Sequence, residues 1–408
     1  MNNIDRGWVL TCFGTAVGAG ILFLPIQVGF SGILPIIFLT SIIFPITYIS
    51  HRGITRIVAS CPKETDIVGA VEYDLGTTAG FIVSVLYFLS IITICVGYAT
   101  GLINLIDAFL VNQLQVASIP RPLLTFIILF FMTAVLLGNE KIMVAITSII
   151  TLPLIILLFG VSIYMIPKWS ITAFHSQFIL KDFIKNTFLL LPLVIFSMNF
   201  SPVCSVLGAF YRKKYGNSQE AIKRSDKVVK WNSIILLFFV MFFVFSMFFS
   251  LTPNVLAVAK ENNLDVLSAI AALAETSLER YFVYIFPMVA FLAISSSYFG
   301  HFTGTREGLS GVICRLFNCK EDIHSNKMKF ISTAVLFILL WILAVYNPSI
   351  LTIISALSAP IIAMYAYLMP IIMMKKVPRL SIYRSKFAAF VFIMGILTII
   401  GYLAGEII

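Results

Sequence analysis

The stretch Gly14-Thr15-Ala16-Val17-Gly18-Ala19-Gly20 places three glycines in seven residues, in the middle of the apolar run Trp8–Phe30. Each glycine in a helix costs about 1 kcal/mol relative to alanine, so this stretch weakens a helix that the apolar run would otherwise favour. A break there frees backbone polar groups, which lipid tolerates only where protein or a cavity satisfies them. Two interpretations stand at this point: a broken helix that holds a small solute, or close helix packing through small-xxx-small spacing.

The composition identifies the chain as an integral membrane protein. Of its 408 residues, 60% are hydrophobic and 11% are charged, whereas a soluble domain has about 25% charged residues. Too little polar surface is present to coat a water-facing globule, so lipid must cover much of the outside. The net charge of +10 does not indicate nucleic acid, because the basic residues lie in short gaps between apolar runs. The six cysteines include no C-x-x-C pair and predict no metal site.

Eleven apolar runs approach or exceed the length that crosses a bilayer, which is about twenty mainly apolar residues. They are Trp8–Phe30, Ile33–Ile57, Ala79–Leu110, Leu123–Leu137, Ile142–Ile166, Asn186–Tyr211, Val228–Leu251, Tyr281–Ile313, Phe330–Val345, Ser349–Met374 and Phe387–Ile407. The sequence therefore predicts an all-α integral membrane protein with eleven transmembrane helices. Residues 1–408 are expected to form a single transmembrane domain, since no soluble domain interrupts the pattern.

The distribution of lysine and arginine orients the predicted helices. With the N-terminus inside, the inner gaps hold 22 of the 28 basic residues and the outer gaps hold six. Short cytoplasmic loops carry such an excess of basic residues. We therefore expect a multi-pass protein with a cytoplasmic N-terminus and, because eleven is odd, a C-terminus outside.

The sixth apolar run is interrupted in the same way as the first. Its middle reads Phe196-Ser197-Met198-Asn199-Phe200-Ser201-Pro202-Val203. Ser201 followed by Pro202 resembles an N-cap and a first-turn proline, which predicts that an inner half-helix restarts near Pro202. The outer half-helix is expected to end near Ser197. A second break favours the solute-binding interpretation of the first one.

The two breaks lie five predicted helices apart, and this odd number has a topological consequence. The second set of five helices must be inverted relative to the first. Interrupted helices at corresponding places in two inverted halves are the best sequence indication of a transporter's central site. The predicted repeats cover about 8–166 and 186–374, and an extra helix covers about 387–407.

The helix ends at the two breaks suggest which solute fits. The outer half of the first helix starts near Ala19 and Gly20, where free amides and the positive end of the helix dipole suit a carboxylate. The half-helices that end near Ala16 and Ser197 offer free carbonyls for an ammonium group, so we expect a zwitterionic amino acid. The expected substrate-binding residues are Thr15, Ala16, Gly18, Ala19, Gly20, Tyr98, Ser197, Asn199, Phe200 and Ser201.

Motifs along nearly the whole chain resemble those of the bacterial hydroxy/aromatic amino acid permeases, and most of all their serine and threonine transporters. In order they are Gly14–Pro25, His51-Arg52-Gly53, Phe196–Pro202, Phe243–Ser246 with Leu251–Pro253, Gly300-His301 with Arg306–Gly308, and Asn347–Ile350. The resemblance implies the amino acid–polyamine–organocation fold with five-plus-five inverted repeats and broken helices 1 and 6. It also implies the bacterial cytoplasmic (inner) membrane and cation-driven uptake, usually with protons.

The coupling ion is either a proton, which the resemblance favours, or sodium. Relatives usually carry a lysine where this chain has Ser296, and a polar residue where it has Phe200. A proton needs a group that titrates within the membrane, and His301 is the candidate, although it could equally be bonded to its own backbone. Sodium prefers several oxygen ligands, and the candidates are carbonyls of Val17, Gly18 and Gly20 with the hydroxyls of Ser296 and Ser297.

The first functional hypothesis is a secondary symporter that imports a small neutral hydroxy amino acid, such as serine or threonine, by alternating access. An aromatic amino acid permease of the same family is the alternative, since Phe200 makes the pocket more apolar, and a channel is a third. No catalytic triad or phosphate loop has the required spacing, so an enzyme is not expected. The expected partners are the amino acid and the lipid bilayer, with no nucleic acid and no cofactor besides the coupling ion.

The predicted orientation is testable with reporters fused to the C-terminus. Alkaline phosphatase needs disulfides that form outside the cytoplasm, so a fusion at Ile408 is expected to be enzymatically active. The same position fused to a fluorescent protein that matures only in the cytoplasm is expected to be dark. The reverse pattern would show that the number of membrane crossings is even.

Overall fold

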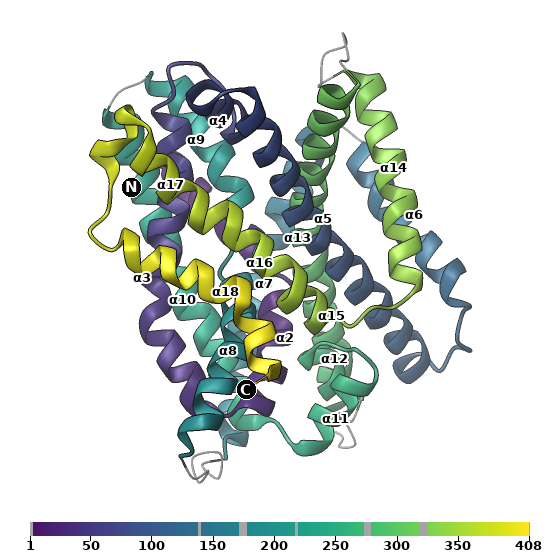
Figure 1. The fold of residues 1–408 in the computed structure, drawn as a ribbon. Coiled ribbons are helices and arrows are strands. Elements are labelled where there is room, and N and C mark those ends of the chain that lie inside the picture. Colours follow the sequence, from purple (N-terminus) through teal and green to yellow (C-terminus); the bar gives the residue numbers. More distant parts are fainter. Residues whose placement is uncertain are drawn as a thin grey trace.

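The protein is a bundle of long helices in this computed structural model (Figure 1). The structure describes residues 3–137, 140–170, 178–216, 219–272, 279–317 and 325–407, and no strand occurs among them. The helices of the first half are α1 (Asn3–Ala16), α2 (Ala19–Ser31), α3 (Ile33–Ala59), α4 (Ile67–Leu75), α5 (Thr77–Ala108), η1 (Phe109–Gln113), α6 (Arg121–Leu137), α7 (Glu140–Tyr164) and η2 (Ile166–Lys168).

The second half begins with another long helix that is broken near its middle. Its helices are α8 (Leu180–Ser197), α9 (Ser201–Tyr215), α10 (Gln219–Ser250), α11 (Pro253–Glu261), α12 (Val266–Ala272), α13 (Glu279–Leu316), α14 (Asn326–Val345), α15 (Ile350–Thr352), η4 (Ile353–Ser358), α16 (Ala359–Ile362), η5 (Ala363–Leu368), α17 (Met369–Lys376), η6 (Pro378–Tyr383) and α18 (Ala388–Ile407). The five segments from α15 to α17 follow one another without a gap and form one apolar helix, Ile350–Lys376.

Each predicted apolar run coincides with helix, although Trp8–Phe30 and Asn186–Tyr211 are each divided between two helices. Within the described ranges, nine helices are long and apolar enough to cross a membrane, and the bent pair α1–α2 raises the number to as many as ten. The predicted run Leu123–Leu137 falls in α6, which is a shorter apolar helix. The structure thus confirms the all-helical membrane fold, while the count of eleven spans and the inverted repeat stay predictions.

Each broken helix packs against a long helix from the other half of the chain. α1 and α2 pack against α10, and α8 and α9 pack against α3, while α9 also packs against α10. The long helices α5 and α13 run against each other beside them. Two inverted repeats would produce such an arrangement, because the first helix of each repeat would then lie on the second helix of the other.

Prolines explain why the helix Ile350–Lys376 is irregular. Two widened segments with π-type hydrogen bonds, η4 and η5, each end shortly before a proline, Pro360 and Pro370. Proline has no amide proton and its ring clashes with the carbonyl four residues earlier, and a π-type turn removes that clash. The helix therefore stays continuous despite two prolines.

Ion pairs gather at the end of the bundle that carries α4 and α17, which is the end predicted to face the cytoplasm (Figure 1). Among the described residues, four pairs join different elements: Arg56 with Asp226, Arg224 with Asp5, Arg315 with Glu72, and Arg379 with Asp74. Each ties a segment from one half of the chain to a segment from the other. This end is therefore closed by charge pairs as well as by apolar packing.

Asp5 is a fully buried charged residue at this end. Its side chain is 0% exposed, and it lies in the first turn of α1. The Tyr211 hydroxyl on α9 donates to Asp5 Oδ1 at 2.5 Å, and Arg224 Nη1 on α10 donates to Oδ2 at 3.1 Å. One carboxylate thereby ties α1 to both α9 and α10.

Replacing Asp5 is expected to loosen this end of the bundle. Asp5→Ala leaves the buried Tyr211 hydroxyl without its acceptor and Arg224 without its buried partner, so the melting temperature of the purified protein should fall by several degrees. Glu220→Ala is the matched control, because it removes the other, exposed partner of Arg224. Exposed ion pairs contribute little to stability, so its melting temperature should stay close to that of the wild type. Equal melting temperatures for both variants would contradict this role of Asp5.

Candidate functional site

The first broken helix bends by 51° between α1 and α2. α1 ends at Ala16 and α2 begins at Ala19, as the sequence predicts, so Val17 and Gly18 form the break. The Gly18 backbone is extended, with φ of −158°, which any residue can adopt. Backbone conformation alone therefore does not require a glycine at this position.

Close approach of two neighbouring helices explains Gly18 instead. A Cβ atom at Gly18 would lie 2.5 Å from the Ser297 hydroxyl oxygen on α13 and 2.9 Å from the Tyr98 hydroxyl oxygen on α5. Both distances are shorter than real carbon–oxygen contacts, so no side chain fits there without a shift. The break is thus in direct contact with both long helices that flank it.

Ser297 joins α13 to the backbone oxygens of the first break. Its hydroxyl donates to the Val17 carbonyl oxygen at 2.6 Å, and the Gly14 and Thr15 carbonyl oxygens lie 3.4 and 3.5 Å away. Four oxygen atoms therefore gather at one point. Ser296 does not take part, because its hydroxyl donates to the Ala293 carbonyl of its own helix at 3.1 Å. Of the two predicted serines, only Ser297 reaches the break.

The second broken helix has the predicted bounds but not the predicted cap. α8 ends at Ser197 and α9 begins at Ser201, with Pro202 in its first turn. Ser201 is not the N-cap: Phe200 occupies that position and makes no side-chain cap hydrogen bond. The Ser201 amide instead donates to the Asn199 side-chain oxygen at 3.2 Å. The prediction that Ser201 caps this helix was therefore wrong, because Ser201 already lies within the first turn of α9.

His51, which sequence analysis placed only in a family motif, lies at the second break. It is 0% exposed on α3, and its Nε2 atom accepts a hydrogen bond of 3.1 Å from the Phe200 amide. The His51 and Phe200 rings stack, with centroids 4.0 Å apart. The predicted apolar run Ile33–Ile57 contains His51, but the sequence analysis gave this residue no role beyond the family motif. The length of this apolar run was the feature of the sequence that placed His51 within a membrane-spanning helix.

The two breaks lie next to each other in the bundle. A Cβ atom at Gly20, in the first turn of α2, would lie 2.6 Å from the Phe196 ring and 3.1 Å from Ser197 Cα at the end of α8. The Tyr98 ring lies 6.5 Å from the Phe196 ring and 5.3 Å from the His301 ring. Tyr98 and the two breaks thus belong to one cluster.

The predicted site residues are all buried, and several use their polar groups within their own helices. Thr15 and Ser197 donate to the carbonyls of Thr11 and Leu193, four residues earlier, and His301 Nδ1 lies 2.8 Å from the Ser297 carbonyl. The ten predicted substrate-binding residues are at most 8% exposed. The structure therefore represents a conformer in which both breaks are closed off from the surface.

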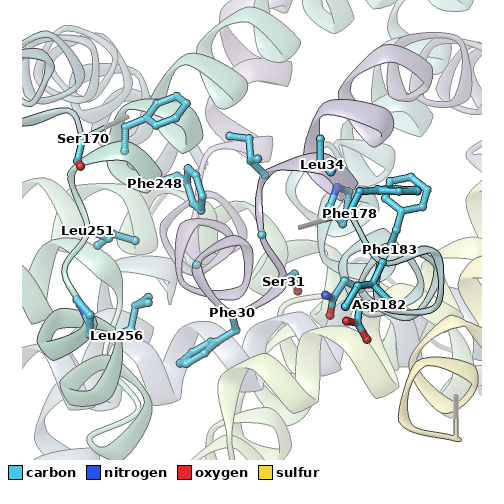
Figure 2. A pocket seen from close by; sticks show the side chains of 18 residues that line it. Phe30, Ser31, Leu34, Ser170, Phe178, Asp182, Phe183, Phe248, Leu251 and Leu256 are labelled. Carbon is cyan, nitrogen blue, oxygen red and sulfur yellow. The ribbon is translucent and has the colours of Figure 1, made fainter. Parts of the chain in front are cut away.

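A cavity of 350 Å³ lies beside α2, at the end of the bundle that carries α11. It is lined by α2, the α11–α12 segment and the start of α15, together with Tyr402 and Glu406 of α18. A larger cavity of 510 Å³ lies at the turn between α2 and α3 (Figure 2). Figure 2 shows Ser31 of this turn on the side of Asp182 of α8, and Phe30 pointing the other way. No residue of either break lines this cavity. Of these two cavities, the smaller one reaches Phe23 on α2, and neither is lined by a residue of the breaks.

Comparison with known proteins identifies the family of this chain. A model of the tryptophan/tyrosine permease family matches residues 6–403. The chain belongs to this family. The serine transporter SdaC of Escherichia coli (strain K12) is 35% identical to it over 407 residues, which cover 97% of this chain and 93% of SdaC. The threonine/serine transporter TdcC of Yersinia enterocolitica is 33% identical over 416 residues, covering 97% and 94%.

Solved structures of transporters share the fold. MhsT in complex with L-phenylalanine superposes with a TM-score of 0.62, at 14% identity, over 98% of this chain and 97% of MhsT. Mhp1, a nucleobase-cation-symport-1 family transporter in a closed conformation with bromovinylhydantoin bound, gives 0.61 at 12% identity, over 98% and 91%. These findings confirm the predicted membrane fold and the predicted resemblance to a family of bacterial amino acid permeases.

Adding one methyl group at Gly18 is expected to disable this permease. Gly18→Ala forces Ser297 or Tyr98 to move, and such overpacking costs about 1–3 kcal/mol, so uptake of its labelled amino acid substrate by cells should fall about tenfold or more. Gly97→Ala on α5 is the matched control, because its Cβ would meet nothing closer than 4.0 Å. Full activity of Gly18→Ala would contradict the close approach of α5 and α13 to the break.

Proposed function

We propose that this protein is a secondary symporter that imports a small neutral hydroxy amino acid, serine or threonine, into the cytoplasm by alternating access. The observation that carries the proposal is the contact between two helix ends of opposite polarity at the breaks. Relatives named as serine and threonine/serine transporters support the choice of substrate. The symport mechanism rests on the coupling argument below.

The helix ends at the breaks suit the two charges of an amino acid backbone. The first turn of α2, at Ala19 and Gly20, presents amides and the positive end of its dipole. The last turn of α8 ends at Ser197 and presents carbonyls and the negative end. Gly20 and Ser197 Cα lie close enough that a Cβ on the glycine would be 3.1 Å away. A carboxylate and an ammonium group on one carbon atom would bridge these two ends.

Phe200 favours a small substrate over an aromatic one once its position is considered. Its ring stacks on His51 of α3 and is 0% exposed, so it is already packed against protein. An aromatic substrate would need space that Phe196 and Tyr98 also occupy beside the breaks. The description of the family as tryptophan/tyrosine permeases still supports the aromatic alternative, so the substrate experiment includes both classes.

The coupling ion is a proton in this proposal, and sodium is the alternative that a specific observation favours. The four oxygens around the Ser297 hydroxyl, with the Gly14, Thr15 and Val17 carbonyls, would serve as ligands of a small cation. In the described conformer, however, the Ser297 hydroxyl proton itself satisfies the Val17 carbonyl. A sodium ion would have to displace that hydrogen bond before it could bind.

A competition panel tests the substrate. Purified protein in liposomes is expected to take up labelled L-serine, and excess unlabelled serine or threonine should abolish the signal, whereas tryptophan and tyrosine should leave it unchanged. Liposomes without protein provide the background. Competition by tryptophan but by neither serine nor threonine would replace this proposal with the aromatic alternative. Accumulation above the outside concentration would also exclude a channel, because a channel only equilibrates its solute.

The coupling ion is tested by replacing sodium with choline at fixed pH. Uptake driven by a pH gradient that is alkaline inside should be undiminished, because no sodium ligand is then needed. Loss of uptake in choline, and its return with sodium, would contradict proton coupling. The oxygens around the Ser297 hydroxyl would then be the sodium site to mutate.

A further inference from the structure

The imidazole of His51 has an unusual partner for a buried histidine. Its Nε2 atom accepts from the Phe200 amide at the second break, which is a backbone group that the interrupted helix leaves without a helical acceptor. Its Nδ1 atom lies 2.8 Å from the Thr47 carbonyl oxygen and 2.9 Å from the Ser50 hydroxyl, both on α3. The ring therefore connects α3 directly to the break between α8 and α9.

These partners determine which nitrogen carries the proton. A backbone amide can only donate, so Nε2 must be the unprotonated acceptor. A backbone carbonyl can only accept, so Nδ1 must carry the hydrogen. The described conformer thus requires a neutral His51. A second proton would go to Nε2, and there it would face the N–H of Phe200, donor against donor.

We propose that His51 binds the proton that drives transport, and that protonation releases the Phe200 amide and rearranges the second break. This inference rests on the proposed function, since it assigns the coupling proton of that symporter to one side chain. The proton binds to Nε2, and the hydrogen bond from Phe200 breaks in the same step. The freed amide then belongs to a helix end beside the substrate site, next to Asn199 and Ser201.

The surroundings of the ring contain no charge that would hold His51 permanently protonated. Within the described part of the chain, its hydrogen bonds and ring contacts involve no charged side chain. The titratable groups near it are the Tyr367 phenol on η5, whose ring lies edge-on at 6.2 Å, and the Cys204 thiol on α9, which donates to the Phe200 carbonyl. Along α3, Arg52 donates to Tyr48, and Arg56 pairs with Asp226 of α10.

The other buried histidine of the described residues is connected differently. His301 also places Nδ1 beside a carbonyl of its own helix, that of Ser297, and its ring contacts Tyr98. His51 differs because its second nitrogen is bonded to the backbone of a break. A proton on His51 therefore acts directly on the geometry of the broken helix, which is what coupling requires: the ion must bind two conformers with different affinity.

Glutamine at position 51 separates the two roles of the histidine, which are to accept a hydrogen bond from the Phe200 amide and to bind a proton. In His51→Gln, the side-chain oxygen can still accept from the Phe200 amide, but the group no longer titrates. The probe is labelled L-serine in sodium-free liposomes, with a pH difference of one unit, alkaline inside. One proton per serine supports an inside-to-outside ratio of about 10 for the wild type, whereas His51→Gln should give a ratio of about 1. Serine exchange without any gradient should remain measurable in the variant.

Ser50→Ala is the matched control for this experiment. It removes a neutral neighbour of the same ring but leaves Nε2 and the Thr47 carbonyl in place, so pH-driven accumulation should persist. Accumulation by His51→Gln at the wild-type ratio overturns the proposal. A wild-type protein that accumulates serine only with a sodium gradient also overturns it, even if His51→Gln does not fold. Absence of serine exchange in the wild type would instead overturn the proposed function, and the two failures are therefore distinguishable.

Discussion

The structure depends on one constraint: a backbone group freed by a helix break inside a membrane must find its partner within the protein. At the second break, the side chains of His51 and Asn199 accept from two consecutive amides, those of Phe200 and Ser201. At the first break, the Ser297 hydroxyl donates to the Val17 carbonyl. The partners of the breaks thus come mainly from α3 and α13, helices that are themselves continuous. These continuous helices supply hydrogen-bond partners that the broken helices lack.

This arrangement makes the two breaks parts of one unit. The start of α2 packs on the end of α8 through Gly20 and Phe196, and Tyr98 of α5 touches the ring of Phe196. A displacement of either broken helix therefore has to move through side chains that also contact the other. Interiors packed at this density switch between discrete arrangements rather than deforming gradually. A change in the hydrogen bonds of one break is consequently transmitted to the other break, and so to the proposed solute site.

Local signals in the sequence located the breaks, whereas long-range packing decided which side chains serve them. Clustered glycines and a Ser-Pro pair act through their own backbone, so the sequence placed the helix ends at Ala16, Ala19 and Ser197 correctly. Ser296 and Ser297 differ by about 100° around their helix, and only the packing of α13 shows that Ser297 faces the break. The role of His51 depends on a contact between positions 149 residues apart, which no local pattern encodes.

The burial of Asp5 has a consequence for how the protein opens toward the end that carries α4. α1 cannot leave α9 and α10 until a carboxylate, a phenol and a guanidinium group have been separated. These groups are stable apart only in water, and water reaches Asp5 only once that end has opened. The hydrogen bonds of Asp5 must therefore break at the same time as water reaches its carboxylate. In the proposed transport cycle, such a step has a high barrier and few populated intermediates, so this end is expected to be either shut or wide open, with little leakage of solute between turnovers.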